Sequence, residues 1–223
     1  MQQFLKLALY LHIFAGFTAL TTGLVPMFSK KGSKVHITWG KVYYWAMFVV
    51  ALTALIRFQM KLNLIFLSGI AVFSFYNTFT GVRLIHRKTN PKPKFIDWFG
   101  AILMVFGSFG MLYFSYLAYQ INNVFFAILF TIFGIFMLVL TLEDLQVFMG
   151  SKPINSDVPL QTRYWFQNHI SRMGGSYIAT VTAFLVVNNP PYIPGLVVWL
   201  APGVIGGFLI SRTRRFYMDK FGK

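Results

Sequence analysis

Seven apolar stretches, each long enough to cross a lipid bilayer as a helix, run through this chain of 223 residues. About 20 apolar residues are needed for one helical crossing. Backbone N–H and C=O groups find no water in the bilayer core, so a spanning segment must satisfy its hydrogen bonds internally, as a helix does. We therefore predict an all-α transmembrane bundle that forms a single domain, residues 1–223. Its seven spans are expected at residues 4–28, 38–58, 62–86, 96–119, 122–146, 164–187 and 193–213.

The composition excludes several kinds of chemistry. Charged residues make up only 11% of the chain, against about a quarter in soluble domains. There is no cysteine, which excludes disulfides and thiolate ligands. The sequence contains no HExxH or GxSxG motif and no phosphate-binding glycine loop, and no Asp or Glu falls at mid-span. The sequence therefore assigns no enzymatic reaction.

The basic residues predict the orientation. They lie in the short connections between the apolar stretches, which indicates a lipid bilayer and not nucleic acid as the partner. Sixteen lysines and arginines fall on one side and three on the other, with Arg172 inside a span. Because positive residues collect in the cytoplasm, we expect a cytoplasmic C-terminus and an N-terminus on the outside.

A polar face is expected on the sixth span, in the stretch "NHISRMGGSYIAT". His169, Arg172, Ser176 and Thr180 are spaced by three and four residues, so they share one face of a helix, with Tyr177 beside them. A charge at the depth of the arginine costs about 2.5–3.5 kcal/mol. We therefore predict that this side chain faces the bundle interior.

An inward Arg172 needs a partner. Asp97, Glu143, a backbone carbonyl or a bound anion such as a phosphate or carboxylate could supply it. The alternative is that the side chain extends to the headgroups at the cytoplasmic surface.

Three histidines are expected in the same membrane layer. His36, His86 and His169 lie on three different spans in the cytoplasmic half, whereas His12 lies in the outer half and is not expected to join them. Imidazoles from three helices could bind zinc or another divalent metal, and two could ligate a single haem. The alternative is that each histidine hydrogen-bonds a neighbouring helix or a lipid headgroup.

Two segments carry a family resemblance. The stretches "LHIFAGFTALTTGLVPMFSKKGSKVHITWGKVYYWAM" and "NHISRMGGSYIATVTAFLV" resemble the bacterial multipass membrane protein family called domain of unknown function 2306. The usual family pattern has arginine where this chain has Ile37 and Ser176. The resemblance implies a helical integral membrane protein of the bacterial cytoplasmic membrane, and it supplies no reaction.

Three functional interpretations follow. The first is a cytoplasmic-side pocket that binds a metal ion or haem, with a redox or hydrolytic role. Besides the three histidines, it would be lined by Tyr44, Arg83, Arg172, Ser176 and Tyr177. The second is a transporter, or a protein that binds lipid or a small anion, in which Arg172 meets the anion. The third is an assembly partner of a membrane complex or a homo-oligomer, which would pack through glycine-rich helix faces.

Overall fold

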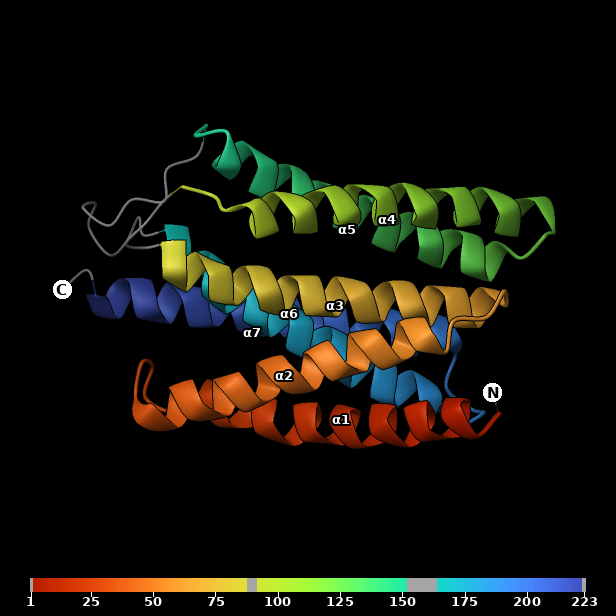
Figure 1. Cartoon of the computed structure of the whole chain (residues 1–223), viewed down its shortest axis with the longest axis horizontal. Coiled ribbons are helices and arrows are strands. Elements are labelled where there is room, and N and C mark those ends of the chain that lie inside the picture. The colour runs from red at the N-terminus through yellow and green to blue at the C-terminus, as the bar shows by residue number, and fades with distance from the viewer. Residues whose placement is uncertain (1, 88–91, 152–163, 222–223) are drawn as a thin grey trace. The chain divides into compact units, whose positions relative to one another are not determined.

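The structure is a computed structural model, which describes residues 2–87, 92–151 and 164–221. Within these ranges the chain forms seven α-helices and no strand, so the predicted all-α fold with seven spans is confirmed (Figure 1). The helices are α1 (Gln2–Phe28), α2 (Lys34–Ile56), α3 (Leu62–Arg87), α4 (Phe95–Gln120), α5 (Val124–Phe148), α6 (Tyr164–Val187) and α7 (Gly195–Phe221). The orientation in the membrane stays a prediction.

Two helix ends differ from the expected bounds by more than three residues. Helix α2 begins at Lys34 because Ser33 caps it, the Ser33 hydroxyl oxygen accepting a bond from the backbone N–H of His36 at 3.2 Å. Helix α7 continues to Phe221, well past its apolar part, through a segment rich in arginine, which is a good helix former. The expected bounds were set by the ends of the apolar stretches. A helix cap and a polar extension of a helix both lie outside such a stretch, so this criterion does not detect them.

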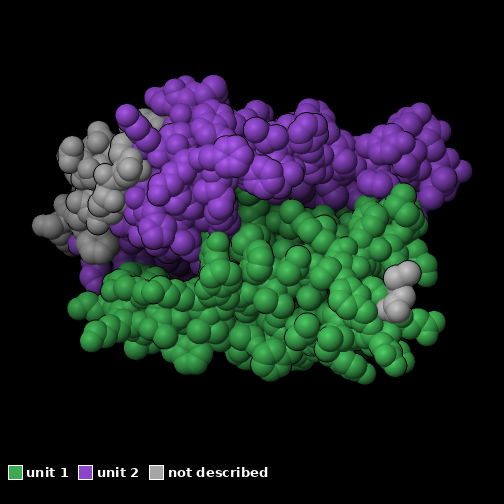
Figure 2. Space-filling model, in the orientation of Figure 1, with its two compact units in different colours: residues 1–78, 175–204 green, residues 79–174, 205–223 purple. Residues whose placement is uncertain are grey.

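The chain divides into two compact units (Figure 2). Unit 1 consists of Met1–Thr78 and Gly175–Val204, and unit 2 of Phe79–Gly174 and Ile205–Lys223. Unit 1 contains the packed pair α1 and α2, and unit 2 contains the packed pair α4 and α5. Helices α3, α6 and α7 are each divided, with one part in unit 1 and the other part in unit 2. The single-domain prediction stays untested.

The distribution of side chains is that of a protein surrounded by lipid. All seven helices are long and apolar enough to cross a membrane. Large apolar side chains such as Phe14, Phe106 and Phe136 are more than half exposed. Fully buried positions include polar side chains, among them Thr78, Ser108, Thr141 and Ser176. Such an apolar exterior would be unfavourable in water and is stable in a bilayer, which supports a multipass integral membrane protein.

Candidate functional site

The side chain of Arg172 lies inside unit 2, on α6. Arg172 is 2% exposed. Its Nη2 donates to Asp144 Oδ1 at 2.8 Å and to the carbonyl oxygen of Leu140 at 2.9 Å, both on α5. Asp144 is also buried, so both members of the ion pair are shielded from solvent. The predicted inward position of Arg172 is confirmed, and the alternative in which it extends to the headgroups is wrong.

The carboxylate that pairs with Arg172 is one that the sequence analysis did not select. Of the predicted partners, the backbone carbonyl is confirmed, the carboxylates of Asp97 and Glu143 are wrong, and a bound anion stays a prediction. Leu140 and Asp144 are four residues apart, so one turn of α5 presents a carbonyl oxygen and a carboxylate to the same guanidinium. That spacing is readable in the sequence, but the helix that lies opposite Arg172 is not.

A second ion pair in unit 2 joins Arg83 of α3 to Asp97 of α4. Arg83 Nε and Nη2 donate to Asp97 Oδ1 and Oδ2, both at 2.7 Å, in the two-pronged geometry that makes arginine–carboxylate pairs strong. The backbone N–H of Lys94 donates a third bond to Asp97 Oδ2 at 2.8 Å. Asp97 lies in the first turn of α4, where the helix dipole favours negative charge. Arg83, which was predicted to bind a ligand, is held by this carboxylate.

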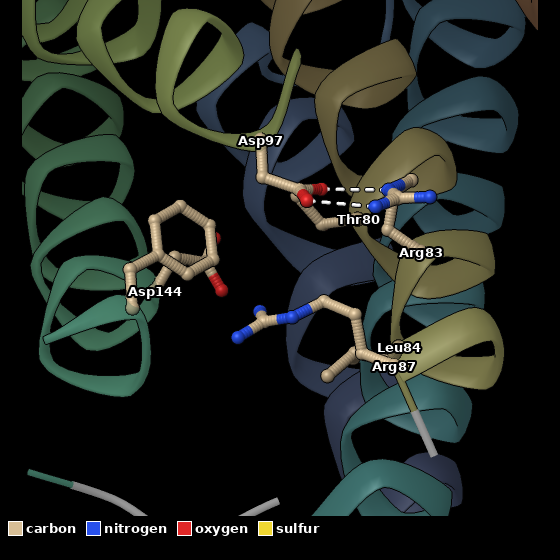
Figure 3. Close-up of a pocket in the computed structure, with 7 residues that line it drawn as sticks. Thr80, Arg83, Leu84, Arg87, Asp97 and Asp144 are labelled. Carbon is tan, nitrogen blue, oxygen red and sulfur yellow. Dashed lines mark hydrogen bonds and ion pairs between the residues drawn. The ribbon is translucent and has the colours of Figure 1, made fainter. Parts of the chain in front are cut away.

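A small cavity lies beside these ion pairs, with space for about one water molecule. It is lined by Thr80, Arg83, Leu84, Arg87, Asp97, Asp144 and Phe148 (Figure 3). The guanidinium of Arg87 lies over the Phe148 ring, 4.7 Å from its centroid, and points toward Asp144 (Figure 3). Asp144 therefore belongs both to the cavity wall and to the ion pair with Arg172. Arg87 is not among the predicted site residues, although Arg83 and Arg87 are four residues apart and share a helix face.

Arg172 keeps one buried donor atom without a partner. Its Nη1 is shielded from solvent, and no hydrogen-bond acceptor lies within reach. A buried donor left unpaired costs about 1–3 kcal/mol, and more on a charged group. Few such groups occur in native proteins, and functional sites are one of the places where they do. A water molecule or an anionic oxygen beside Nη1 would be stabilised.

Gly81 lets α3 and α6 approach closely in unit 2. Its carbonyl oxygen accepts a hydrogen bond from His169 Nδ1 at 2.8 Å. A Cβ atom on Gly81 would lie 3.0 Å from Met173 Sδ and 3.2 Å from Arg172 Cβ, closer than ordinary contact allows. A small residue is therefore needed for this approach. His169, predicted as a metal ligand, is used here to join α6 to α3.

His36 closes the C-terminal end of α1 in unit 1. Its Nδ1 donates to the carbonyl oxygen of Pro26 at 3.0 Å. Lys31 Nζ donates to the same oxygen at 2.8 Å and to the carbonyl oxygen of Met27 at 2.9 Å. Burial lowers the pKa of the Lys31 ammonium. The last carbonyl groups of a helix lack partners within it, so these two side chains satisfy groups that would otherwise be exposed to the membrane surface.

The predicted three-histidine metal site has no support in the structure. Among the described residues, no three His, Asp or Glu side chains come together in a way that could hold a metal ion. His36 and His169 bond to backbone carbonyls, which is the alternative reading, and His86 is exposed at the end of α3. His12, expected to stand apart, pairs its Nδ1 with the Thr53 hydroxyl at 2.9 Å.

A chain of hydroxyl groups joins three helices inside unit 1. Ser176 Oγ on α6 lies 2.8 Å from the Tyr43 hydroxyl on α2 and 2.6 Å from Thr78 Oγ1 on α3. Thr78 donates its one proton to the carbonyl oxygen of Ser74 at 3.0 Å, so Ser176 must donate to Thr78. All three hydroxyl residues are at most 2% exposed. Ser176, which was predicted to bind a ligand, connects helices here.

The two predicted tyrosines occupy different surroundings in unit 1. The Tyr177 hydroxyl donates to the carbonyl oxygen of Leu20 at 2.9 Å, which joins α6 to α1. The Tyr44 ring packs edge-on against Phe75, with centroids 5.6 Å apart. Its neighbour Tyr43 is the tyrosine that takes part in the buried hydroxyl chain. Consecutive helix positions point about 100° apart, so only one of the two tyrosines can face Ser176. Both are tyrosines in an apolar span, so apolarity alone could not show which one does.

No protein-family model matches this chain, and no similar curated protein or solved structure was found. The functional argument therefore depends on the side chains described above.

Proposed function

We propose that the protein is a multipass membrane protein that binds an anionic group, such as a phosphate, sulfate or carboxylate. One oxygen atom of this group would occupy the small cavity of unit 2, which has space for about one water molecule. The observation that carries this proposal is the buried Nη1 of Arg172, which has no partner. The carboxylate that Arg172 binds through Nη2, Asp144, lines the cavity together with Arg83 and Arg87. Ionisable side chains inside a membrane are costly, and they are usually retained for function.

The chemistry of the cavity favours an anion over a metal cation. Arginine stays protonated and presents a planar set of N–H donors that matches the oxygen atoms of phosphate and carboxylate. Three guanidinium groups, those of Arg83, Arg87 and Arg172, outnumber the two carboxylates of Asp97 and Asp144, so the net positive charge would repel a divalent cation. Zinc prefers thiolate, imidazole and carboxylate ligands, and no grouping of three such ligands occurs among the described residues.

The cavity would face the cytoplasm in the predicted orientation. It lies among the C-terminal ends of α3 and α5 and the N-terminal end of α4. The basic residues of the connection between α3 and α4 support a cytoplasmic position for these ends. The proposal places the protein in a cytoplasmic membrane, as the resemblance in the first and sixth spans implies.

Anion binding is tested with the whole protein, purified in an uncharged detergent. Radiolabelled sulfate, phosphate and acetate serve as soluble probes. For the lipid source, nanodiscs of zwitterionic lipid with and without an anionic phospholipid are compared. Saturable binding of soluble anions without lipid indicates a free anion, whereas binding only of the anionic phospholipid indicates a headgroup.

Two variants link the binding to the cavity. Arg87→Gln removes a charge from the cavity wall and should weaken binding by at least about tenfold, since a hydrogen bond to a charged group contributes about 1.5–3 kcal/mol. Arg212→Gln, at an exposed position of α7, is the matched control and should bind as the unchanged protein does. Equal effects of the two variants, or no saturable binding of any probe, would contradict the proposal.

A further inference from the structure

A second arginine with a buried donor that lacks a partner lies in unit 1. Arg57 directly follows the last residue of α2 and ends this helix. Its Nη1 is shielded from solvent, and no acceptor among the described residues lies within hydrogen-bond reach of it. A buried donor on a charged group is costly to leave unpaired, and such groups are rare in native proteins. An acceptor supplied by a ligand would stabilise this guanidinium.

No side chain of unit 1 can neutralise the charge of Arg57. The residues of this unit, 1–78 and 175–204, include no aspartate and no glutamate. In unit 2, by contrast, Arg83 and Arg172 each pair with a carboxylate. In the predicted topology Arg57 lies at the outer ends of the spans, whereas all five carboxylates of the chain lie on the cytoplasmic side. The counter-charge of Arg57 is therefore expected to come from outside the chain.

The side chains near Arg57 supply no negative charge. Arg57 interacts electrostatically with His12 of α1, whose ring is neutral or positive. The His12 Nδ1 lies 2.9 Å from Thr53 Oγ1, and the Thr53 hydroxyl donates its one proton to the carbonyl oxygen of Val49 at 2.6 Å. Nδ1 must therefore donate to Thr53, which holds the ring in place. An anionic group beside Arg57 would meet no like charge from these neighbours.

The position of Arg57 along α2 corresponds to the level of the lipid headgroups. Helix α2 has 23 residues. At 1.5 Å per residue it is about 34 Å long, and the hydrocarbon core of a bilayer is about 30 Å thick. The next apolar side chains, Phe58 and Met60 in the connection to α3, are 44% and 77% exposed. A cation beside exposed apolar side chains at this level matches a ligand with an anionic head and a hydrocarbon tail.

We infer that Arg57 binds the phosphate group of one phospholipid, in the outer leaflet of the predicted orientation. A phosphate oxygen accepts a hydrogen bond from Nη1, and Phe58 and Met60 contact the acyl chains. The planar N–H donors of arginine match the oxygen atoms of a phosphate, which supplies the missing negative charge. The site uses residues of unit 1 alone and does not depend on the anion binding proposed for unit 2.

Native mass spectrometry of the whole protein, purified in detergent and freed of co-purified lipid, counts the bound lipid. Phosphatidylcholine is the probe, because its net charge is zero and it does not report on the anion proposed for unit 2. A diacylglycerol with the same acyl chains, which lacks the phosphate group, is the control ligand. We expect one tightly bound phosphatidylcholine and no comparable binding of diacylglycerol.

Three variants assign the lipid to Arg57. Arg57→Gln should weaken phosphatidylcholine binding by at least about tenfold, since it removes a hydrogen bond from a charged donor. Arg57→Lys keeps the charge without the planar donors and should bind with intermediate affinity. Lys6→Gln, at an exposed position of α1 in the same unit, is the matched control and should bind as the unchanged protein does.

Thermal unfolding distinguishes lipid binding from a purely structural role of Arg57. A ligand that binds the folded state raises the unfolding temperature, so phosphatidylcholine should raise it in the unchanged protein and in Lys6→Gln, and much less in Arg57→Gln. Without lipid, Arg57→Gln should unfold at or above the temperature of the unchanged protein, because it removes an unpaired charge. An equal loss with and without lipid would show that Arg57 only stabilises the end of α2, and would overturn the inference.

Three binding results would also overturn the inference: undiminished phosphatidylcholine binding by Arg57→Gln, equal binding of diacylglycerol, or binding of inorganic phosphate at Arg57 without any binding of phospholipid. The proposed function fails separately. Arg57→Gln should lose the phospholipid and keep sulfate binding, whereas Arg87→Gln should lose sulfate binding and keep the phospholipid.

Discussion

Arg172 Nη2 and Asp144 Oδ1 lie 2.8 Å apart, and their side chains are only 3% and 7% exposed. A buried ion pair of this kind is not by itself a strong stabiliser, because removing two charges from water costs about as much as their attraction returns. Its members depend on each other, however, since either one alone would be an uncompensated charge in the membrane. The structural and the functional roles of Arg172 can therefore be separated by comparing single and double variants.

Arg172→Leu is expected to destabilise the protein and to abolish anion binding. Loss of one member of a buried pair typically costs about 3–5 kcal/mol, because the other charge is left without compensation. The double variant Arg172→Leu with Asp144→Leu removes both charges and should regain most of this stability, but not the binding. Thermal unfolding in detergent measures the first effect and sulfate binding the second. A double variant that binds sulfate normally would contradict the role given to Arg172.

Arg172→Lys separates charge from geometry. Arginine binds Asp144 and the carbonyl oxygen of Leu140 through Nη2 alone and keeps Nη1 for the proposed anion. Lysine keeps the positive charge but has only one nitrogen for all of these contacts. We expect an unfolding temperature between those of the unchanged protein and Arg172→Leu, and weakened sulfate binding. A lysine variant that matches the unchanged protein in both measurements would show that charge alone suffices.

The spans and the inward position of Arg172 were predictable because they depend on local properties of the chain. The length of an apolar stretch and the three-four spacing of His169, Arg172 and Ser176 are visible without knowing any neighbour. The partner Asp144 was not predictable, since the choice of which helix lies opposite α6 depends on the packing of the whole unit. Apolarity also could not reveal that Gly81 admits this close approach.

The histidines were misleading for a related reason. His36 and His169 each make a polar contact, but the partner is a backbone carbonyl, that of Pro26 for His36 and that of Gly81 for His169. Every residue has a backbone carbonyl, so the sequence does not show which carbonyl groups at helix ends or at glycine will accept a bond from a histidine. A sequence pattern that selects imidazoles therefore cannot distinguish a metal ligand from a helix-joining hydrogen bond.

Tyr43→Phe tests the hydroxyl chain of unit 1. It removes the hydroxyl that lies 2.8 Å from Ser176 Oγ and keeps the ring, so we expect a loss of about 1 kcal/mol in stability, the usual contribution of one hydrogen bond. Tyr10→Phe, on α1 of the same unit and 67% exposed, is the matched control and should change nothing. Thermal unfolding of the two variants gives the comparison, and equal values would mean that the chain contributes no stability.

The orientation of the seven helices is tested with reporter fusions. We expect a fusion after Asn123, in the uncharged connection between α4 and α5, to report the outside, and a fusion at the C-terminus to report the cytoplasm. The physical reason is the excess of lysine and arginine on the side of the C-terminus. Identical signals from both fusions would remove the seven-span topology, and reversed signals would place the cavity of unit 2 on the outside.

Two glycines of α1 are expected to respond oppositely to alanine. A Cβ atom on Gly23 would lie 2.5 Å from Tyr177 Cδ2 and 3.0 Å from Tyr43 Cδ2, whereas one on Gly16 would meet nothing within 4 Å. Both aromatic rings are held in place, Tyr177 by its bond to the carbonyl oxygen of Leu20 and Tyr43 by its bond to Ser176, so neither can move aside freely.

Gly23→Ala should therefore destabilise unit 1 by about 1–3 kcal/mol, the usual cost of overpacking. Gly16→Ala, two helical turns earlier on the same helix, should be neutral or stabilise the protein by up to about 1 kcal/mol, because alanine is the better helix former. Thermal unfolding in the same detergent measures both. If Gly16→Ala were the more harmful variant, the face of α1 that packs against Tyr43 and Tyr177 would be a different one, since a Cβ cannot clash where no neighbour lies.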